Sequence, residues 1–492
     1  MKVKEKRADY FVIPDAEKNV GWVRPEAVTH YHDATGQHEW PVMTIEEVAN
    51  VNPGVGKAAI PDDLPVSFVP MPSVGAGDGS IHVEKTRPAS EVKKGFTVFL
   101  EGDVLFAKIT PCMENGKMAI VPKLVNGYGF GSTEFHVLRP KPGMDAKYLY
   151  YYVSSQAFRG EAERYMTGAV GQKRVSTTYL KQSTIPVAPP DQQKRIVAEI
   201  EKQFSRLDEA VANLKRVKAN LKRYKAAVLK SAIEGRLVET EAELARREGR
   251  SYETGVQLLQ RILETRRSQW KGKGKYKEPA APNTTDLPEL PEGWVWATYA
   301  QIGEVTTGFT PPTADTDNFG GDIPFFKPTD LDAGDNVVMA REYLSEKGAA
   351  KGRLLTAGSV LVTCIGATIG KTGLARVDCA TNQQINSVTP LSNLIDSDFV
   401  YAWTVSPYGY KQILNNSSAT TLPILNKSKF EALGVPLPPL AEQHRIVSEV
   451  DRRLSIVREV EAQVDANLKR ADGLRASTLG QAFRGGALHA GI

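Results

Sequence analysis

Two glycine-rich stretches are the parts of this chain that most resemble ligand-binding sites. Residues 366–372 resemble the loop that cradles phosphate groups in nucleotide-binding proteins. That loop has four residues between its glycines and this stretch has three, so the loop would be the wrong size. Residues 74–79 resemble the glycine-rich turn that binds S-adenosylmethionine, but Pro70 and Pro72 precede them and no helical pattern follows. We expect plain loops at both places.

The histidines and cysteines give no stronger sign of catalysis. His30, His32 and His38 lie close to Asp33, but nothing nearby completes a set with the spacing of a known metal site. The three cysteines are too few and too scattered for a disulfide framework or a zinc site. No Ser/His/Asp or Cys/His set stands out either. We therefore expect a binding protein with no catalytic residues and no metal.

Composition sets wide limits on the class of protein. With 41% apolar residues the chain can build ordinary cores, and its net charge of +5 does not by itself demand a polyanionic partner. No run of 18 apolar residues occurs, and no apolar region follows the charged residues 1–7. We expect no membrane span, no signal peptide and a cytoplasmic location.

One stretch occurs twice, and the rest of the chain is organised around it. Residues 185–238 match residues 435–488 at a constant offset of 250 positions. Each copy begins with prolines, continues with an acidic residue suited to a helix N-terminus and ends at glycine (Gly235 and Gly485). Each copy therefore predicts a helix of about 45 residues, roughly 65 Å long.

Apolar residues recur in both copies in alternating steps of three and four, which is the spacing of a coiled coil. Because both copies have the same phase, we expect the two helices to pair with each other; two unrelated long helices are the alternative. Charged residues interrupt the seam in both copies. The predicted apolar seam comprises Val197, Ile200, Phe204, Leu207, Val211, Leu214, Leu221, Val228, Val447, Val450, Leu454, Val457, Val464 and Leu468.

The two stretches that precede the helices also resemble each other. Residues 102–117 match 358–371 loosely, and residues 132–140 match 382–390; the scaffold positions agree and the polar positions differ. This is expected of one fold that performs two versions of one task. The predicted order is a leader (1–38), a globular domain (39–184), a long helix (185–238), a helical segment with a basic flexible linker (239–289), a second globular domain (290–434) and a second long helix (435–492).

Four segments resemble the specificity subunits of type I restriction–modification systems. They are Pro-Leu-Pro-Pro-Leu-Ala-Glu-Gln-His-Arg-Ile-Val at 436–447, Leu-Gly-Gln-Ala-Phe-Arg-Gly-Gly at 479–486, and residues 287–296 and 415–427. The resemblance covers nearly the whole chain. It implies a mixed α+β (α/β) fold with two similar target-recognition domains, joined by two long helices in an antiparallel coiled coil with pseudo-two-fold symmetry.

The resemblance also implies partners. Each globular domain would recognise one half of a split sequence in double-stranded DNA, while the helices would space the halves and bind two methyltransferase subunits. Restriction–translocase subunits would join that complex. S-adenosylmethionine, ATP and Mg are expected on these partner subunits and no cofactor is expected in this chain.

Contacts to DNA bases require amides, Arg or Lys, and Ser or Thr on exposed loops. For each such residue a structural hydrogen bond or a solvated charge is the alternative interpretation. Two further hypotheses stay open at this point: a coiled-coil scaffold with two ligand-binding lobes and no DNA role, and an enzyme fused to such a scaffold. The candidate DNA contacts are Lys108, Thr110, Asn115, Lys117, Gln172, Lys173 and Arg174 in the first domain and Lys327, Thr363, Thr368, Lys371, Gln383, Gln384 and Lys427 in the second.

Overall fold

The computed structural model describes residues 40–83, 85–169, 171–272, 274–285, 287–418 and 422–483. The predictions for the leader, with its histidines and Asp33, and for Gly485 lie outside the described residues. The chain divides into two compact units, residues 1–210 with 469–492 and residues 211–468. Each long helix contributes one part to each unit, so the units are described in turn.

The globular part of the first unit is built from short strands. They are β1 (Val42–Thr44), β2 (Ala49–Val51), β3 (Pro65–Val69), β4 (Lys85–Pro88), β5 (Thr97–Phe99), β6 (Val104–Ala107), β7 (Met118–Ile120), β8 (Gly129–Gly131), β9 (Phe135–Pro140) and β10 (Thr184–Pro186). Two four-stranded sheets have the orders β2-β9-β6-β7 and β4-β3-β8-β5, and β1 pairs with β10. All these pairs are antiparallel except β3 with β8.

Short helices pack against both of these sheets. They are α1 (Ile45–Val48), α2 (Ala89–Val92), α3 (Ala146–Ser154), α4 (Gln156–Arg164) and α5 (Thr177–Gln182), with 3-10 turns η1 (Lys57–Ala59), η2 (Met71–Ser73) and η3 (Val125–Gly127). Among them, α2 packs against the β4-β3-β8-β5 sheet. Tyr148, Leu149 and Val153 of α3 join Phe106 of β6 and Leu138 of β9 in one buried core. The helix α3 therefore packs on the β2-β9-β6-β7 sheet.

The second unit repeats this plan. Its strands are β11 (Val295–Thr298), β12 (Gly303–Thr307), β13 (Phe319–Phe326), β14 (Glu342–Leu344), β15 (Val360–Thr363), β16 (Thr372–Leu374), β17 (Ala380–Thr381), β18 (Ile385–Pro390) and β19 (Gly434–Leu437). Its short helices are α7 (Glu241–Glu248), α8 (Gly255–Ser268), α9 (Tyr299–Ile302), α10 (Glu346–Ala350), α11 (Ser397–Val405), α12 (Pro407–Asn416) and α13 (Lys427–Glu431), with turns η4 (Thr316–Asn318) and η5 (Asp330–Ala333).

The strand orders establish that the sequence repeat is a structural repeat. The order β12-β18-β15-β16 matches β2-β9-β6-β7, and the pair β11-β19 matches β1-β10. The remaining sheet differs, since β14-β13-β17 has three strands where the first unit has four. Helices α3 and α4 are separate, because the Ser155 hydroxyl accepts the Phe158 N–H and starts α4 as a new helix.

The two long helices are α6 (Pro190–Ile233, 44 residues) and α14 (Leu440–Ala482, 43 residues). Gly235 ends the α6 segment with a φ of 65°, and the Arg236 N–H donates to the Ser231 carbonyl at 2.9 Å. This is the left-handed cap that glycine favours at a helix C-terminus. None of the helices in the described ranges is both long and apolar enough to cross a membrane.

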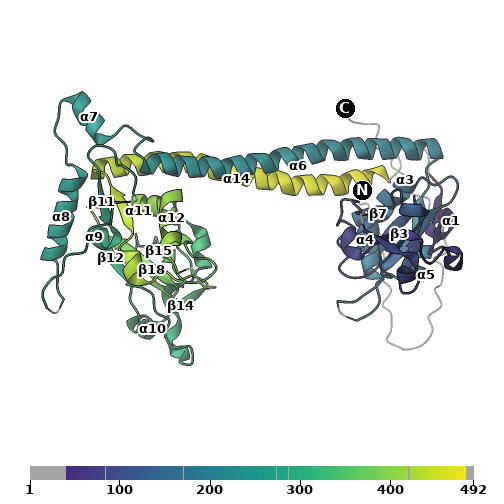
Figure 1. Cartoon of the computed structure of the whole chain (residues 1–492), viewed down its shortest axis with the longest axis horizontal. Helices are drawn as coiled ribbons and strands as arrows, with labels where there is room; N and C mark the ends of the chain where they lie inside the picture. The colour runs from purple at the N-terminus through teal and green to yellow at the C-terminus, as the bar shows by residue number, and fades with distance from the viewer. Residues whose placement is uncertain are drawn as a thin grey trace, which may run out of the picture. The chain divides into compact units, whose positions relative to one another are not determined.

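The two long helices run antiparallel wherever they meet. In the first unit Gln203 bonds to Thr478 at 3.2 Å, and Asp208, further along α6, pairs with the earlier residue Arg475. In the second unit Lys218 pairs with Asp465 at 2.6 Å. There the last turns of α6 share a buried cluster with the first turns of α14. Figure 1 shows the two helices side by side in this unit.

The seam between the helices is apolar and partly interrupted. Every residue of the apolar seam set defined above is buried or half-buried. Lys218 and Lys225 are exposed, and Arg475 lies with its guanidinium carbon 4.9 Å from the centre of the Phe204 ring. A cation over an aromatic face is stabilising, so this charged seam position still contributes to packing.

A buried glutamine fastens the start of each long helix to its globular domain. Gln193 accepts the Asp145 N–H at 2.8 Å and donates to the Ala188 carbonyl at 2.7 Å. Gln443 accepts the Asp396 N–H at 2.9 Å and donates to the Pro438 carbonyl at 3.0 Å. Both side chains are completely buried. Because an unmade buried amide bond is costly, each long helix is held at a defined position on its own domain.

The residue before each glutamine differs between the repeats. Trp40 donates to Gln192 at 3.0 Å, whereas Trp294 donates to Glu442 at 3.0 Å. The second oxygen of Glu442 accepts the N–H of Glu241 at the start of α7. Glu442 is fully buried, and burial raises the pKa of its carboxyl above the ordinary value. The second repeat therefore uses a carboxyl group to hold α7.

We expect Val464→Asp to destabilise the second unit by about 2–4 kcal/mol, because it places a charge in the seam. Val464 is 4% exposed, whereas Val217 on α6 is 40% exposed. Val217→Asp is the matched control and should change the free energy of unfolding by less than about 0.5 kcal/mol. Urea unfolding followed by circular dichroism measures both. Equal effects would contradict the assignment of the seam.

Glu442 should give stability a measurable pH dependence. Since its pKa is raised in the folded state, its contribution is fully present below the unfolded pKa and is lost as the pH rises through the folded pKa. We expect the melting temperature of the unsubstituted chain, relative to Glu442→Gln, to fall as the pH rises above the ordinary glutamate pKa of about 4.3. Glu449→Gln is the control, because hydrogen bonds from Arg452 and Arg453 lower the pKa of Glu449 to about 2. The melting temperature of the unsubstituted chain, relative to Glu449→Gln, should therefore stay constant or rise over the same pH range.

Candidate nucleic-acid interface

In the first domain, the loop between β6 and β7 meets the segment that precedes α5. The Thr110 N–H donates to the Lys173 carbonyl at 3.0 Å, and the Val175 N–H donates to the Lys108 carbonyl at 2.9 Å. An isolated bridge also joins Ile109 to Arg174. The structure thus brings together Lys108, Thr110 and the Gln172–Arg174 stretch, 60 or so residues apart in the chain, into one loop cluster.

Arg174 is fastened inside this cluster by Glu134. Its Nε and Nη2 donate to the two carboxylate oxygens of Glu134 at 2.9 and 2.8 Å, and its Nη1 donates to the Gln172 carbonyl at 2.9 Å. The hydrogen bonds from Arg174 lower the pKa of Glu134. Because the guanidinium fork is occupied, Arg174 shapes the loop, while the adjacent Gln172 and Lys173 are exposed.

A buried histidine supports the cluster from behind. His136 Nε2 lies 2.9 Å from the Val175 carbonyl oxygen, and its Nδ1 lies 3.0 Å from the amide nitrogen of Asn52. A carbonyl only accepts, so Nε2 carries the proton and Nδ1 accepts from Asn52. Burial lowers the pKa of His136, which is consistent with a neutral ring. His136 and Asn52 were not among the predicted residues.

The second domain has the same cluster with other side chains. The Gly366 N–H donates to the Pro423 carbonyl at 3.0 Å, and the Leu425 N–H donates to the Cys364 carbonyl at 2.8 Å. Asn386 takes the place of His136: it donates to the Leu425 carbonyl at 3.2 Å and accepts from the Thr307 hydroxyl at 2.8 Å. The sequence match of residues 132–140 with 382–390 contained this signal, since it sets His136 opposite Asn386.

The repeated loop cluster agrees with a family comparison. A model described as "Type I restriction modification DNA specificity domain" matches residues 37–223 and 291–470, which is more than half of the chain. The chain belongs to this family. The two matched ranges, each containing one loop cluster, are called the first and second specificity domains below.

Individual relatives and solved structures agree with this membership. The type I restriction enzyme EcoAI specificity subunit of Escherichia coli is 26% identical over 469 residues, covering 84% of this chain and 77% of that protein. The HindI specificity subunit of Haemophilus influenzae is 24% identical and covers 72% of this chain and 82% of that protein.

Two solved structures share the fold. A chain from a study of complex assembly and conformational transition of the type I R-M system has a TM-score of 0.67 at 19% identity, covering 91% of this chain and 98% of that chain. The HsdS subunit of Thermoanaerobacter tengcongensis has a TM-score of 0.55 at 19% identity, covering 91% and 97%.

Several predicted contact residues of the specificity domains have structural partners. The Lys117 ammonium donates to the Val74 carbonyl at 3.0 Å and ties the glycine-rich stretch 74–79 to the β6–β7 loop. The next element that the structure describes after this stretch is the strand β4, in agreement with the expectation that the stretch does not open a helix. Lys327 pairs with Glu342. Thr363 is completely buried in β15, so it is removed from the surface that DNA could reach.

The remaining predicted residues lie at the surface of the clusters. Lys427 of α13 pairs with Glu431 at 3.3 Å. Asn115 is exposed in the first domain, and Thr368 and Gln383 are exposed in the second. Gln384 is half-buried, where its side chain accepts from the Asn382 amide at 2.9 Å.

The stretch 366–372 is a tight turn. The Ile369 N–H donates to the Gly366 carbonyl at 3.1 Å, and the Gly370 N–H donates to the Thr363 carbonyl at 2.8 Å. Lys371 pairs with Asp332 at 2.6 Å. A phosphate-binding loop needs its N–H groups directed at the ligand, so this geometry agrees with the expectation of a plain loop.

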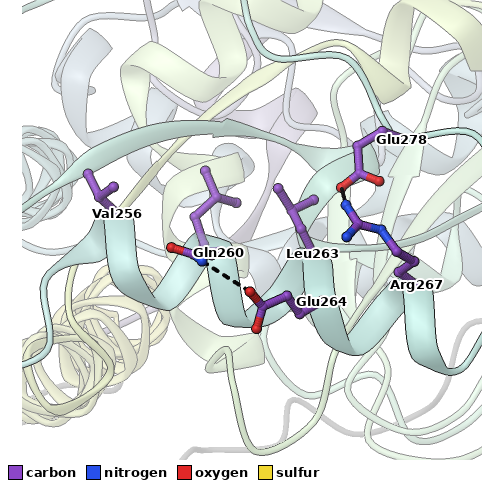
Figure 2. Close-up of a pocket in the computed structure, with 7 residues that line it drawn as sticks. Val256, Gln260, Leu263, Glu264, Arg267 and Glu278 are labelled. Carbon is purple, nitrogen blue, oxygen red and sulfur yellow. Dashed lines mark hydrogen bonds and ion pairs between the residues drawn. The ribbon is translucent and has the colours of Figure 1, made fainter.

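A pocket of about 350 Å³ lies on α8, away from the loop clusters. Val256, Leu259 and Leu263 line it, together with an Arg267–Glu278 ion pair of 3.2 Å (Figure 2). The opposite residues Leu258 and Ile262 are buried in the core of the second specificity domain. None of the predicted DNA contacts lines this pocket.

Lys173→Ala should weaken binding of duplex DNA and lower the slope of log K against log salt concentration by about one unit, if the ammonium contacts a phosphate. Lys181→Ala is the control, because Lys181 is in the same domain but pairs with Glu46 at 2.7 Å. It changes the net charge equally and should leave the slope unchanged. Fluorescence anisotropy at several salt concentrations measures both, and equal slopes for the two variants would contradict the proposed contact.

Proposed function

We propose that this chain is the specificity subunit of a type I restriction–modification complex, in which each specificity domain recognises one half of a bipartite DNA site. The observation that carries the proposal is the loop cluster that occurs in both domains with one backbone plan and different side chains. In each domain a buried side chain donates a hydrogen bond to a carbonyl of the cluster, His136 in the first domain and Asn386 in the second. A repeated frame with variable polar groups suits the recognition of two different sequences.

The two clusters offer DNA different chemistry. The first exposes Lys173 next to the Glu134–Arg174 pair, whereas the second exposes Gln383 and the apolar Ile424, which is 41% exposed. Lysine suits phosphates and guanine, amides suit adenine, and apolar groups suit the thymine methyl. In this proposal the half-sites therefore differ, and the whole site is asymmetric.

The long helices have a separate role in the proposal. They space the half-sites and bind two methyltransferase subunits, with restriction–translocase subunits joining the complex. The chain itself supplies no catalytic group: adenine methylation and ATP-dependent cleavage belong to the partners, which would bind S-adenosylmethionine, ATP and Mg. The fastening of each helix to its domain through Gln193 or Gln443 supports this role, because a platform must hold the domains at defined positions.

Exchange of one domain tests the proposal. Residues 290–434 are replaced by the equivalent segment of a relative, and the complete system is expressed in a host that lacks other methylation. Methylome sequencing should reveal a bipartite motif for the parent and a change in one half-site for the exchange variant. The intact first domain is the internal control. A change in both halves would contradict modular recognition, and a scaffold without a DNA role would produce no motif.

A further inference from the structure

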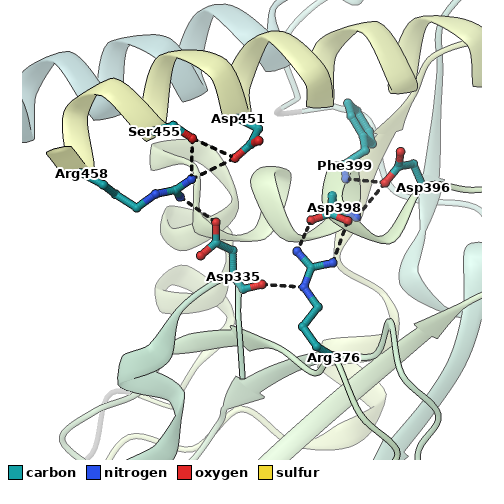
Figure 3. A network of polar contacts seen from close by, with 8 residues as sticks. All are labelled: Asp335, Arg376, Asp396, Asp398, Phe399, Asp451, Ser455 and Arg458. Atoms are coloured by element: carbon teal, nitrogen blue, oxygen red, sulfur yellow. Dashed lines mark hydrogen bonds and ion pairs between the residues drawn. The ribbon is translucent and has the colours of Figure 1, made fainter. Parts of the chain in front are cut away.

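In the second specificity domain, the loop between β13 and β14 is tied to the long helix α14. Arg458 of α14 donates from Nη1 to Asp335 of this loop at 2.9 Å. Its Nη2 donates to Asp451 and to the Ser455 hydroxyl, each at 2.9 Å (Figure 3). The guanidinium is thus oriented by its own helix before it reaches the loop.

A second arginine holds the same loop from the other side. Arg376, which follows β16, donates from Nε to the Asp335 carbonyl at 2.8 Å. Its two terminal nitrogens donate to both carboxylate oxygens of Asp398 in α11, at 3.0 and 2.6 Å. Asp396, the N-cap of α11, is in turn bound through its N–H by Gln443 of α14. The contacts close a ring from α14 through the loop and α11 back to α14, as Figure 3 shows in part.

The described part of the first specificity domain has the same arrangement of loop and domain helix, but it does not have this ring of ionic contacts. A tyrosine of the domain helix contacts a left-handed glycine of the loop in both repeats: Tyr150 lies against Gly79, and Tyr401 lies against Gly334. The residue 250 positions before Arg458 is Asp208, a carboxylate, and it pairs with Arg475 of α14.

A pocket occupies the corresponding place in the first domain. It has a volume of about 470 Å³, and its lining includes Asp78, Gly79, Tyr150 and Asp208. Asp78 of the loop and Asp208 of the helix carry the same charge, so they cannot form the attraction that joins Asp335 to Arg458. Arg475 of α14 also lines this pocket, where it pairs with Asp208, and among the described residues no ion pair joins Asp78 to a long helix.

We infer that Asp335, Arg376 and Arg458 are positioning residues that fix the globular part of the second specificity domain on α14 and thereby set the spacing at which its half-site is accepted. This inference rests on the proposed function. A single exposed ion pair contributes little, but Arg376 binds Asp398 in a bidentate manner and the pairs form one network. With Arg458 and Asp335 47% and 39% exposed, the network is also sensitive to salt.

The test uses the assembled complex and the motif from methylome sequencing. Methylation rates are measured on duplexes with the native spacer and with a spacer longer or shorter by one base pair. Arg458→Gln should reduce the preference for the native spacer about five-fold, the upper range for one exposed pair, and leave the half-sites unchanged. Arg452→Gln is the matched control, because Arg452 pairs only within its helix in the described structure, with Glu449 at 2.7 Å.

A double-mutant cycle makes the test specific. Asp335→Asn should cause the same loss as Arg458→Gln, and the double variant should lose no more than either single variant. High salt should reduce the spacer preference of the unsubstituted complex and not that of the variants. If the Arg458→Gln variant fails to assemble, the spacer preference of Asp335→Asn is compared with that of the unsubstituted complex and of Arg452→Gln.

The outcomes separate the two claims. An unchanged spacer preference, additive losses, or an equal loss in Arg452→Gln would overturn the positioning role while the motif itself stands. Absence of any bipartite motif in the parent system would instead overturn the proposed function.

Discussion

The structure depends on two buried glutamine side chains at the starts of the long helices. Gln193 and Gln443 are completely buried, and each binds the N-terminus of a domain helix and a carbonyl of its own approach segment. A buried amide that loses its partners is costly, so neither helix can rotate on its domain without breaking these bonds. The orientation of each long helix is therefore coupled to the orientation of the globular domain attached to it. For a protein that recognises two separated half-sites, this coupling is the central requirement.

The loop clusters show how a fixed frame permits variable recognition. Their shape is set by backbone hydrogen bonds between loops and by a buried polar group behind them, His136 in one domain and Asn386 in the other. Neither contact uses the exposed side chains. Residues such as Lys173 and Gln383 can therefore differ between the domains without altering the frame. Burial lowers the pKa of His136, which favours the neutral ring.

Small substitutions at equivalent positions give the two repeats different properties. Gln192 becomes Glu442, whose second oxygen holds α7 on the second unit. Asp208, which pairs with Arg475 of α14, becomes Arg458, which pairs with Asp335 of the loop between β13 and β14. In both cases one side chain changes the electrostatics of a shared frame. The repeats have the same fold and are not mechanically equivalent.

The sequence by itself determined the long helices, the heptad phase, the internal repeat and the family resemblance. These features are local or periodic, since prolines, glycine ends and apolar spacing act over a few residues. The tertiary structure decided which polar residues are free to bind. Thr363 and Lys117 had suitable types, but one is buried and the other holds a loop. The Asp335–Arg458 pair joins residues 123 positions apart. No local pattern encodes such a contact, because it exists only after the domain has folded onto the helix.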